Sequence, residues 1–220
     1  MHGEGILSWL AAMSPPARDA AIEARLGIRL PVPTTPPGEH LLGYHPSGIA
    51  AIVRALAEVP VAADDTVIDL GAGLGKVVLL TRLLTGAAAR GIELQAPLVE
   101  QARAAAARVG AQVSFVHADA RTADLGDGTV FFLYAPFTGP VLEEVMRRLH
   151  GVAGRHAIVV CALAVDLDRH APWLVARRID AFWLTVYDSV VPGVAPREAR
   201  RSPLCASLVR AIAEERAVES

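Results

Sequence analysis

The sequence predicts an α/β fold with a doubly wound, mostly parallel sheet and an antiparallel last strand, preceded by a short helical extension. Three observations predict this fold. Short apolar runs alternate with segments of helical apolar spacing from residue 66 onward, which is typical of strands covered by helices on both faces. The last two strand-like runs have no helix between them, which favours antiparallel pairing. A glycine-rich turn directly follows the first strand.

Length and composition agree with one sizeable domain. The chain has 220 residues, 53% hydrophobic and 20% charged, which is enough to bury a core and excludes a disordered chain. Basic and acidic residues nearly balance, 21 against 23, so we expect no nucleic-acid partner. Cys161 and Cys205 form no metal pattern, and no metal is expected. No basic leader and no apolar run of about 20 residues occurs, so we expect no membrane span and a cytoplasmic protein.

Residues 1–43 are expected to form a helical extension with a proline-rich linker, and residues 44–220 the main domain. Two short helices are predicted over 6–13 and 15–26, because Pro15 is typical of a helix start and a glycine follows residue 26. The prolines that follow exclude helix and central strand.

The main domain alternates between the two kinds of element. Further helices are predicted over residues 46–58, 75–84, 96–109, 139–149 and 168–176. Strands are predicted over residues 66–70, 89–93, 112–117, 129–134, 155–163, 178–187 and 205–213. A first strand that runs through glycines into a helix is typical of a Rossmann-like sheet.

The glycine-rich turn carries the first functional signal. Gly71, Ala72, Gly73 and Gly75 lie where backbone N–H groups face outward at a helix start, which favours an anion. The spacing is G-x-G-x-G rather than the dinucleotide pattern G-x-G-x-x-G, and Asp69 stands two residues ahead. A carboxylate there disfavours a diphosphate and suits an ammonium. An amino-acid ligand carries both charges, so the expected cofactor is S-adenosylmethionine (SAM).

Acidic residues also follow the next two strands. Glu93 could accept both ribose hydroxyls, which would suit NAD equally well, and Asp119 could accept the adenine amine. Leu94 and Ala120 adjoin these acids and are expected to line the same site. Because parallel strands end at one edge, these acids and Asp69 would contact ammonium, ribose and adenine in order. The alternative is that they are loop acids that cap helices.

The fourth strand ends in Tyr134-Ala135-Pro136-Phe137. Methyltransferases that act on amino groups of bases or glutamine carry Asn or Asp here, followed by Pro-Pro and an aromatic residue. The Pro-Phe ending is present, but the leading polar residue and the first proline are replaced, which disfavours base N-methylation. Tyr134 is a candidate for cofactor binding and catalysis, with a core role as the alternative.

Residues 44 to about 188 resemble the seven-β-strand protein lysine methyltransferases of the ATP-synthase c-subunit and adenine-nucleotide-translocase type, and more distantly the non-SET histone lysine methyltransferases. The family's Tyr-x-Pro-Thr/Ser, Asp-Leu-Gly-Ser-Gly-x-Gly, Glu-Leu-Asn-Pro-Trp-Leu-Val and Phe-Leu-x-Pro motifs are matched, with substitutions, at residues 44–47, 69–75, 93–99 and 132–136. The Asn-Pro-Trp is absent, and the acid that the family has before its next strand is assigned to Asp119.

The resemblance implies a SAM-dependent methyltransferase of class I with a protein lysine as acceptor; a small-molecule N- or O-methyltransferase is the alternative. Tyr44, Tyr134 and Asp188 are the candidate catalytic residues, with Asp188 placed at the cofactor edge by the end of its strand. Tyr44 is also expected to lie over the cofactor near its sulfonium, and residues 1–43 to form part of the acceptor pocket. A non-catalytic SAM-binding module and an NAD-type dehydrogenase remain open.

Overall fold

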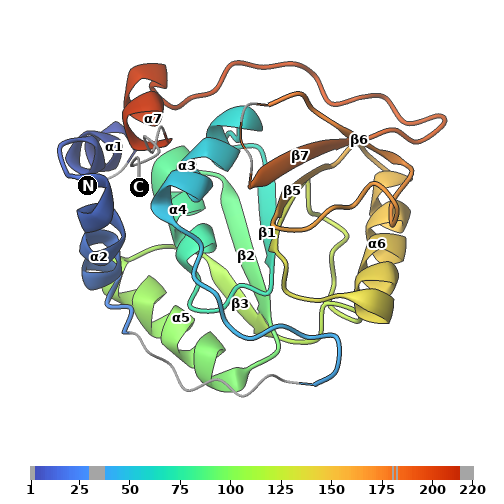
Figure 1. The fold of residues 1–220 in the computed structure, drawn as a ribbon, viewed down its shortest axis with the longest axis horizontal. Helices are drawn as coiled ribbons and strands as arrows, with labels where there is room; N and C mark the ends of the chain where they lie inside the picture. The colour runs from blue at the N-terminus through green and yellow to red at the C-terminus, as the bar shows by residue number, and fades with distance from the viewer. Residues whose placement is uncertain (1–2, 30–37, 180, 182, 214–220) are drawn as a thin grey trace, which may run out of the picture.

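The computed structural model describes residues 3–29, 38–179, 181 and 183–213 (Figure 1). A sheet of seven strands, in the order β3-β2-β1-β4-β5-β7-β6, runs through the molecule. Strands β1 to β5 are parallel to one another, and β7 is antiparallel to both β5 and β6. The predicted α/β, doubly wound, Rossmann-like fold with an antiparallel strand near its end is confirmed.

The bounds of the elements agree closely with those predicted up to β5. The strands are β1 (Thr66–Leu70), β2 (Ala88–Glu93), β3 (Ser114–His117), β4 (Val130–Tyr134), β5 (Val159–Leu163), β6 (Leu174–Ala176) and β7 (Leu184–Ser189). The helices are α1 (Glu4–Ala11), α2 (Pro15–Leu26), α3 (Ile49–Glu58), α4 (Lys76–Thr85), α5 (Ala96–Val109), α6 (Gly139–Ala153) and α7 (Ala206–Ala213).

Strands β4 and β5 are buried on both faces, in agreement with their nearly continuous apolar sequences. Successive residues of β4 point to opposite faces: Val130 and Phe132 pack with α3, α4 and α5, whereas Phe131 and Leu133 pack with α6. The same alternation holds along β5. The sheet therefore separates two apolar cores and presents its strand ends, not its faces, for function.

The C-terminal part differs from the prediction in three places. The strand predicted over 178–187 begins only at Leu184, as β7. Residues 168–176, predicted as a helix, contain strand β6 instead. Pro172 stands inside the segment and cannot join a helix interior, whereas Val175 suits a strand.

Residues 205–213, predicted as the last strand, form helix α7. Its buried residues, Val209 and Ile212, are three apart and so lie on one helix face, whereas a strand would need buried residues two apart. The antiparallel pair at the end of the sheet is consequently β6 with β7, at residues 174–176 and 187–189.

The N-terminal extension packs on the face of the sheet that α3 and α4 cover. Apolar residues of α1 and α2, such as Leu7 and Ile22, belong to the same buried cluster as those of α3 and α4. The buried guanidinium of Arg18 donates to carbonyls of Leu10, Ala211 and Ile212, and so joins α1 and α2 to α7. The proline-rich stretch 30–37 lies outside the described residues, and the expected boundary at residue 43 stays a prediction. None of the described helices is both long and apolar enough to cross a membrane.

Candidate active site

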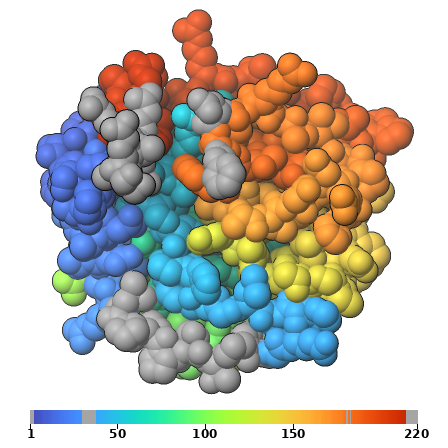
Figure 2. Space-filling model, in the orientation of Figure 1, coloured from blue at the N-terminus to red at the C-terminus, as the bar shows by residue number. Residues whose placement is uncertain are grey.

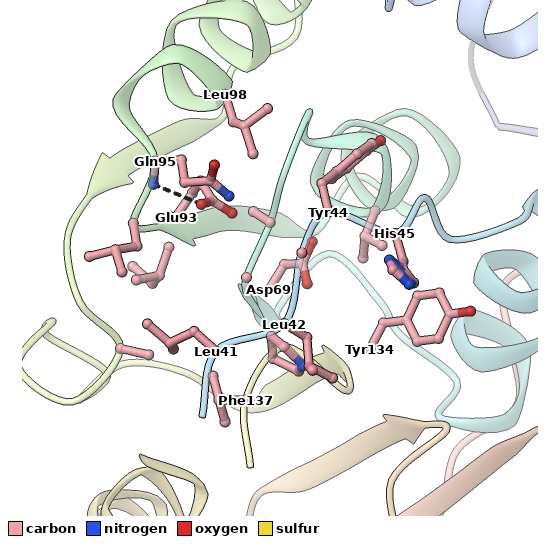
Figure 3. Close-up of a pocket in the computed structure, with 18 of the residues that line it drawn as sticks. Leu41, Leu42, Tyr44, His45, Asp69, Glu93, Gln95, Leu98, Tyr134 and Phe137 are labelled. Carbon is pink, nitrogen blue, oxygen red and sulfur yellow. Dashed lines mark hydrogen bonds between the residues drawn. The ribbon is translucent and has the colours of Figure 1, made fainter. Parts of the chain in front are cut away.

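A cavity lies at the edge of the sheet where β1, β2 and β4 end (Figure 3). Its empty space, counted with the open mouth, is about 900 Å³. Most of the residues expected to bind a cofactor line it: Tyr44, Asp69, Gly71, Ala72, Glu93, Leu94, Asp119, Ala120 and Tyr134. The predicted convergence of acids at one sheet edge is therefore present in the fold.

Residues 38–48, here called the lid segment, pass over this edge. The backbone of residues 40–42 pairs with residues 136–138 after β4: Leu42 N–H donates to the Pro136 carbonyl at 3.0 Å, and Thr138 N–H donates to the His40 carbonyl at 2.8 Å. Figure 2 shows the lid segment in light blue on the surface of the molecule. Its Leu41, Leu42 and Gly43 are part of the cavity wall.

Tyr44 of the lid segment packs against the glycine turn. Its ring edge lies where a side chain on Gly73 would project, with Cδ2 2.6 Å from the position of an added Cβ. Gly73 also has a φ of 52°, a conformation that other residues rarely adopt. Burial, and next the charges of Glu23, Asp69 and Glu93, raise the pKa of the Tyr44 hydroxyl well above its usual value. Tyr44 therefore stays a neutral phenol at physiological pH.

Asp69 lies in the middle of the cavity, between Glu93 on one side and Tyr44 on the other (Figure 3). Its side chain is 4% exposed. Burial and the charge of Glu93 raise its pKa to about 8, and no hydrogen bond from the described residues offsets this effect. A buried carboxylate in this state is suited to a cationic ligand, which would supply the missing counter-charge.

Glu93, the last residue of β2, holds the glycine turn. Its Oε2 accepts from the Gly73 N–H at 2.9 Å, and its Oε1 accepts from the Gln95 N–H at 2.8 Å. The side chain is 7% exposed. Glu93 thus fixes the local backbone, which was one of the two alternatives, and also faces the cavity, while its contact with the ribose stays a prediction.

Because Glu93 both lines the cavity and holds two backbone N–H groups, Glu93→Ala should have two effects. The variant should weaken SAM binding by about 1.5–3 kcal/mol, the range for hydrogen bonds to charged groups. It should also lower the melting temperature of the ligand-free protein, because two backbone N–H groups lose their acceptor. Calorimetry and thermal unfolding measure the two effects. A variant that binds SAM normally and loses only stability would limit Glu93 to the structural role.

Asp119 follows β3 and lines the cavity. Its carboxylate pairs with Arg121, at 2.6 Å from one guanidinium nitrogen, and accepts from the Arg121 N–H. These hydrogen bonds and the positive charge of Arg121 lower the pKa of Asp119. The carboxylate remains ionised, and any adenine contact would share it with Arg121.

Two of the expected cofactor residues support the cavity without lining it. Gly73 lies beneath Tyr44, and Gly75 precedes α4 with Phe115 packed closely against it. The expected contribution of residues 1–43 is limited, among those the structure describes, to Leu41, Leu42 and Gly43.

Asp188 is not part of the site. Because β7 runs antiparallel to β5, Asp188 pairs with Val159, the first residue of β5, at the opposite edge of the sheet. It forms a bidentate ion pair with Arg177, at 2.6 and 2.7 Å. The expected placement assumed the wrong strand direction.

Sequence reasoning missed several lining residues. Gln95 caps the start of α5 and Leu98 belongs to its first turn, and both lie within five residues of Glu93, so their closeness to that acid in the sequence could have indicated them. Lys76, the only lysine of the chain, also lines the cavity although it is 4% exposed. Its two acidic partners come from α2, far away in sequence, so no local pattern indicated them.

Comparisons with known proteins agree with this geometry. A family model described as a methyltransferase domain matches residues 67–155. An RNA methyltransferase from Salinibacter ruber, solved with S-adenosyl-L-homocysteine, is 28% identical, with 70% of this chain and 98% of that chain covered and a TM-score of 0.55. No curated protein sequence matches the chain.

Two further structures show the same fold. TrmN from Thermus thermophilus is 18% identical, with 64% of this chain and 48% of that chain covered and a TM-score of 0.52. A SAM-dependent methyltransferase from Aquifex aeolicus is 15% identical, with 63% and 88% covered and a TM-score of 0.50. These findings do not support an NAD-type dehydrogenase or a non-catalytic module. The domain match, the sheet order and the cavity identify the chain as a SAM-dependent methyltransferase with a class I fold and SAM as its cofactor.

Proposed function

We propose that this methyltransferase acts on an amine, and that the amine is a lysine side chain of a protein. The observation that carries the proposal is the charge of the cavity. Asp69, Glu93 and Asp119 line it, with Asp119 paired to Arg121, and the one lysine there, Lys76, is already paired with two carboxylates of α2. When the cationic cofactor has ionised Asp69, the described lining holds acids and no lysine or arginine that lacks an acidic partner, so it favours a cationic acceptor over a polyanion.

The end of β4 supports the same choice. Tyr134 stands where enzymes that methylate amino groups of bases carry Asn or Asp, and Ala135 follows it with a φ of 36°. Tyr134 and His45 lie near each other on one side of the cavity (Figure 3). The exposed Leu42, with 47% of its surface accessible, also lines the cavity. An aliphatic chain that ends in an amine suits this mixture of aromatic and apolar surface.

The lysine assignment rests further on the resemblance of residues 44–188 to protein lysine methyltransferases. Its Tyr-x-Pro-Ser motif begins at Tyr44, the residue that packs on the glycine turn. The motif thus belongs to the wall of the cavity rather than to a remote surface.

The cavity suits the proposed arrangement of SAM. Asp69 would pair with the cofactor's ammonium, the glycine turn would receive its carboxylate, and Glu93 would accept from its ribose. Bound there, SAM supplies an activated methyl group. Tyr44 and Tyr134 exclude water and hold the acceptor nitrogen in line. The acceptor must arrive as a neutral amine, and its proton passes to water or to His45 at the exposed mouth.

RNA is the second candidate acceptor, because the Salinibacter ruber structure is named an RNA methyltransferase. The acidic lining and the tyrosine at residue 134, where base-methylating enzymes carry Asn or Asp, argue against it. A small-molecule amine or hydroxyl is the third candidate.

Methyl-labelled SAM, incubated with the enzyme and a cell extract, separates these acceptors. We expect label in the protein fraction, released by hydrolysis as N-methyl-lysine. Self-labelling should be minimal, because Lys76 is the only lysine and is buried. Label that appears only in RNA or only in small molecules would overturn the lysine proposal.

Two substitutions of Tyr44 should differ in their effects on SAM affinity and on turnover. Tyr44→Phe keeps the ring on Gly73 but removes the hydroxyl, so SAM affinity should hold while turnover falls. Tyr44→Ala removes the ring as well and should reduce both. Calorimetry and the labelling assay measure the two quantities. Equal turnover of Tyr44→Phe and wild type would contradict a role for the hydroxyl.

A further inference from the structure

Lys76 occupies a position that is unusual for its charge. It is the first residue of α4, where the helix dipole disfavours a cation, and its side chain is 4% exposed. Its ammonium lies 3.0 Å from Asp19 and 2.5 Å from Glu23, both on α2. These two acids are four residues apart and so share one helix face. The lysine therefore bridges two neighbouring carboxylates beside the cofactor cavity that it helps to line.

Asp19 has a second partner. Its Oδ1 accepts from the N–H of Ile49, the first residue of α3, at 3.1 Å. The residue that precedes α3 is Gly48, which has no side chain to cap the helix, so α2 provides the cap. One carboxylate consequently joins the N-terminal ends of α3 and α4 to α2.

This junction fixes one end of the lid segment. Residues 38–48 run directly into α3, and their other end is held by the pairing of residues 40–42 with 136–138. Tyr44 lies between these two attachments, against Gly73. Glu23 is close enough for its charge to contribute to the raised pKa of the Tyr44 hydroxyl. Release of the junction would free Tyr44 and leave an uncompensated negative charge beside it.

We infer that Lys76 is a positioning residue: with Asp19 and Glu23 it ties the N-terminal extension to the lid segment and holds Tyr44 over the cofactor site. The extension is thus part of the cofactor-binding apparatus although its helices do not line the cavity. The inference rests on the cofactor and not on the proposed lysine acceptor, so a failed labelling experiment leaves it standing.

The chain offers a matched control in Arg18, which precedes Asp19. Its three hydrogen bonds go to Leu10, Ala211 and Ile212 and anchor the extension away from the cavity. Arg18→Met should lower thermal stability without changing cofactor affinity. A loss of affinity beyond this control therefore reports on the junction and not on general destabilisation.

The test measures binding of S-adenosylhomocysteine by calorimetry and amide hydrogen exchange across residues 38–48, on the full-length chain. Lys76→Met should weaken binding by about tenfold, within the usual range of coupling between sites, and speed exchange across these residues. Lys76→Arg should restore most of the affinity. Asp19→Ala changes a half-exposed residue, so it serves if Lys76→Met does not fold, with the same expected effects. Affinity and exchange equal to those of Arg18→Met would overturn the inference.

Discussion

Gly73→Val is expected to abolish detectable SAM binding. Gly73 has a φ of 52°, where a β-branched residue is strained by about 1–3 kcal/mol. The new side chain would also occupy the space of the Tyr44 ring. From the sequence we would expect the clash to be with the methionine moiety of the cofactor, whereas the structure places the lid residue there. The valine should therefore displace Tyr44 and distort the turn.

Gly110→Val is the control for this substitution. Gly110 follows α5 with a φ of 65°, and nothing lies within 4 Å of an added Cβ. The two variants should lose similar stability from backbone strain, but only Gly73→Val should lose binding by calorimetry. Normal binding by Gly73→Val would contradict the role given to the turn and the lid segment.

The second large effect is a pH dependence of SAM affinity that Asp69 causes. Its pKa of about 8 means that it is mostly protonated at pH 6 to 7 in the free protein. A cationic cofactor should favour the carboxylate, so binding should release a proton and affinity should rise by up to about tenfold per pH unit below 8. Asp69→Asn cannot release this proton, and we expect it to bind SAM weakly. The α-ammonium of SAM also titrates near pH 8. This titration affects wild type and Asp69→Asn equally, so the ratio of their SAM affinities reports the titration of Asp69 alone.

The same pKa has a consequence for stability. In the unfolded chain Asp69 titrates near 3.8, and in the folded protein near 8. Between these values the folded state binds more protons, so the free energy of unfolding falls as pH rises. Asp69→Asn should remove this loss, and its ligand-free form should be more stable than wild type at pH 8 to 9. Calorimetry and thermal unfolding from pH 5 to 9 measure both effects; a constant affinity ratio across that range would contradict the assignment.

Much of the fold could be predicted, because strands buried on both faces and helices with apolar faces leave clear patterns. The failures lie where local pattern is ambiguous. The apolar residues of α7 can be counted with a period of two or of three to four, and only packing against α3 decides between them. Pro172 disfavours the helix predicted over 168–176, because proline cannot join a helix interior.

The candidate site also contains residues that the sequence could place and residues that it could not. Asp69 and Glu93 could be placed because residues that end parallel strands meet at one edge. Asp188 could not, since its position depended on the direction of β7, which a sequence does not state. The contacts of Lys76 with Asp19 and Glu23 span more than fifty residues, and long-range pairs of this kind leave no local spacing to detect.

A crystal structure with S-adenosylhomocysteine tests the central claim most directly, which is that the lid segment and the strand-end acids together form the cofactor site. We expect the ribose hydroxyls within hydrogen-bond distance of Glu93, the amino group beside Asp69, and the sulfur within about 6 Å of the Tyr44 ring, the limit for a cation–π contact with the sulfonium. A ligand bound elsewhere, or at this edge with Tyr44 turned away from the sulfur, would contradict the account.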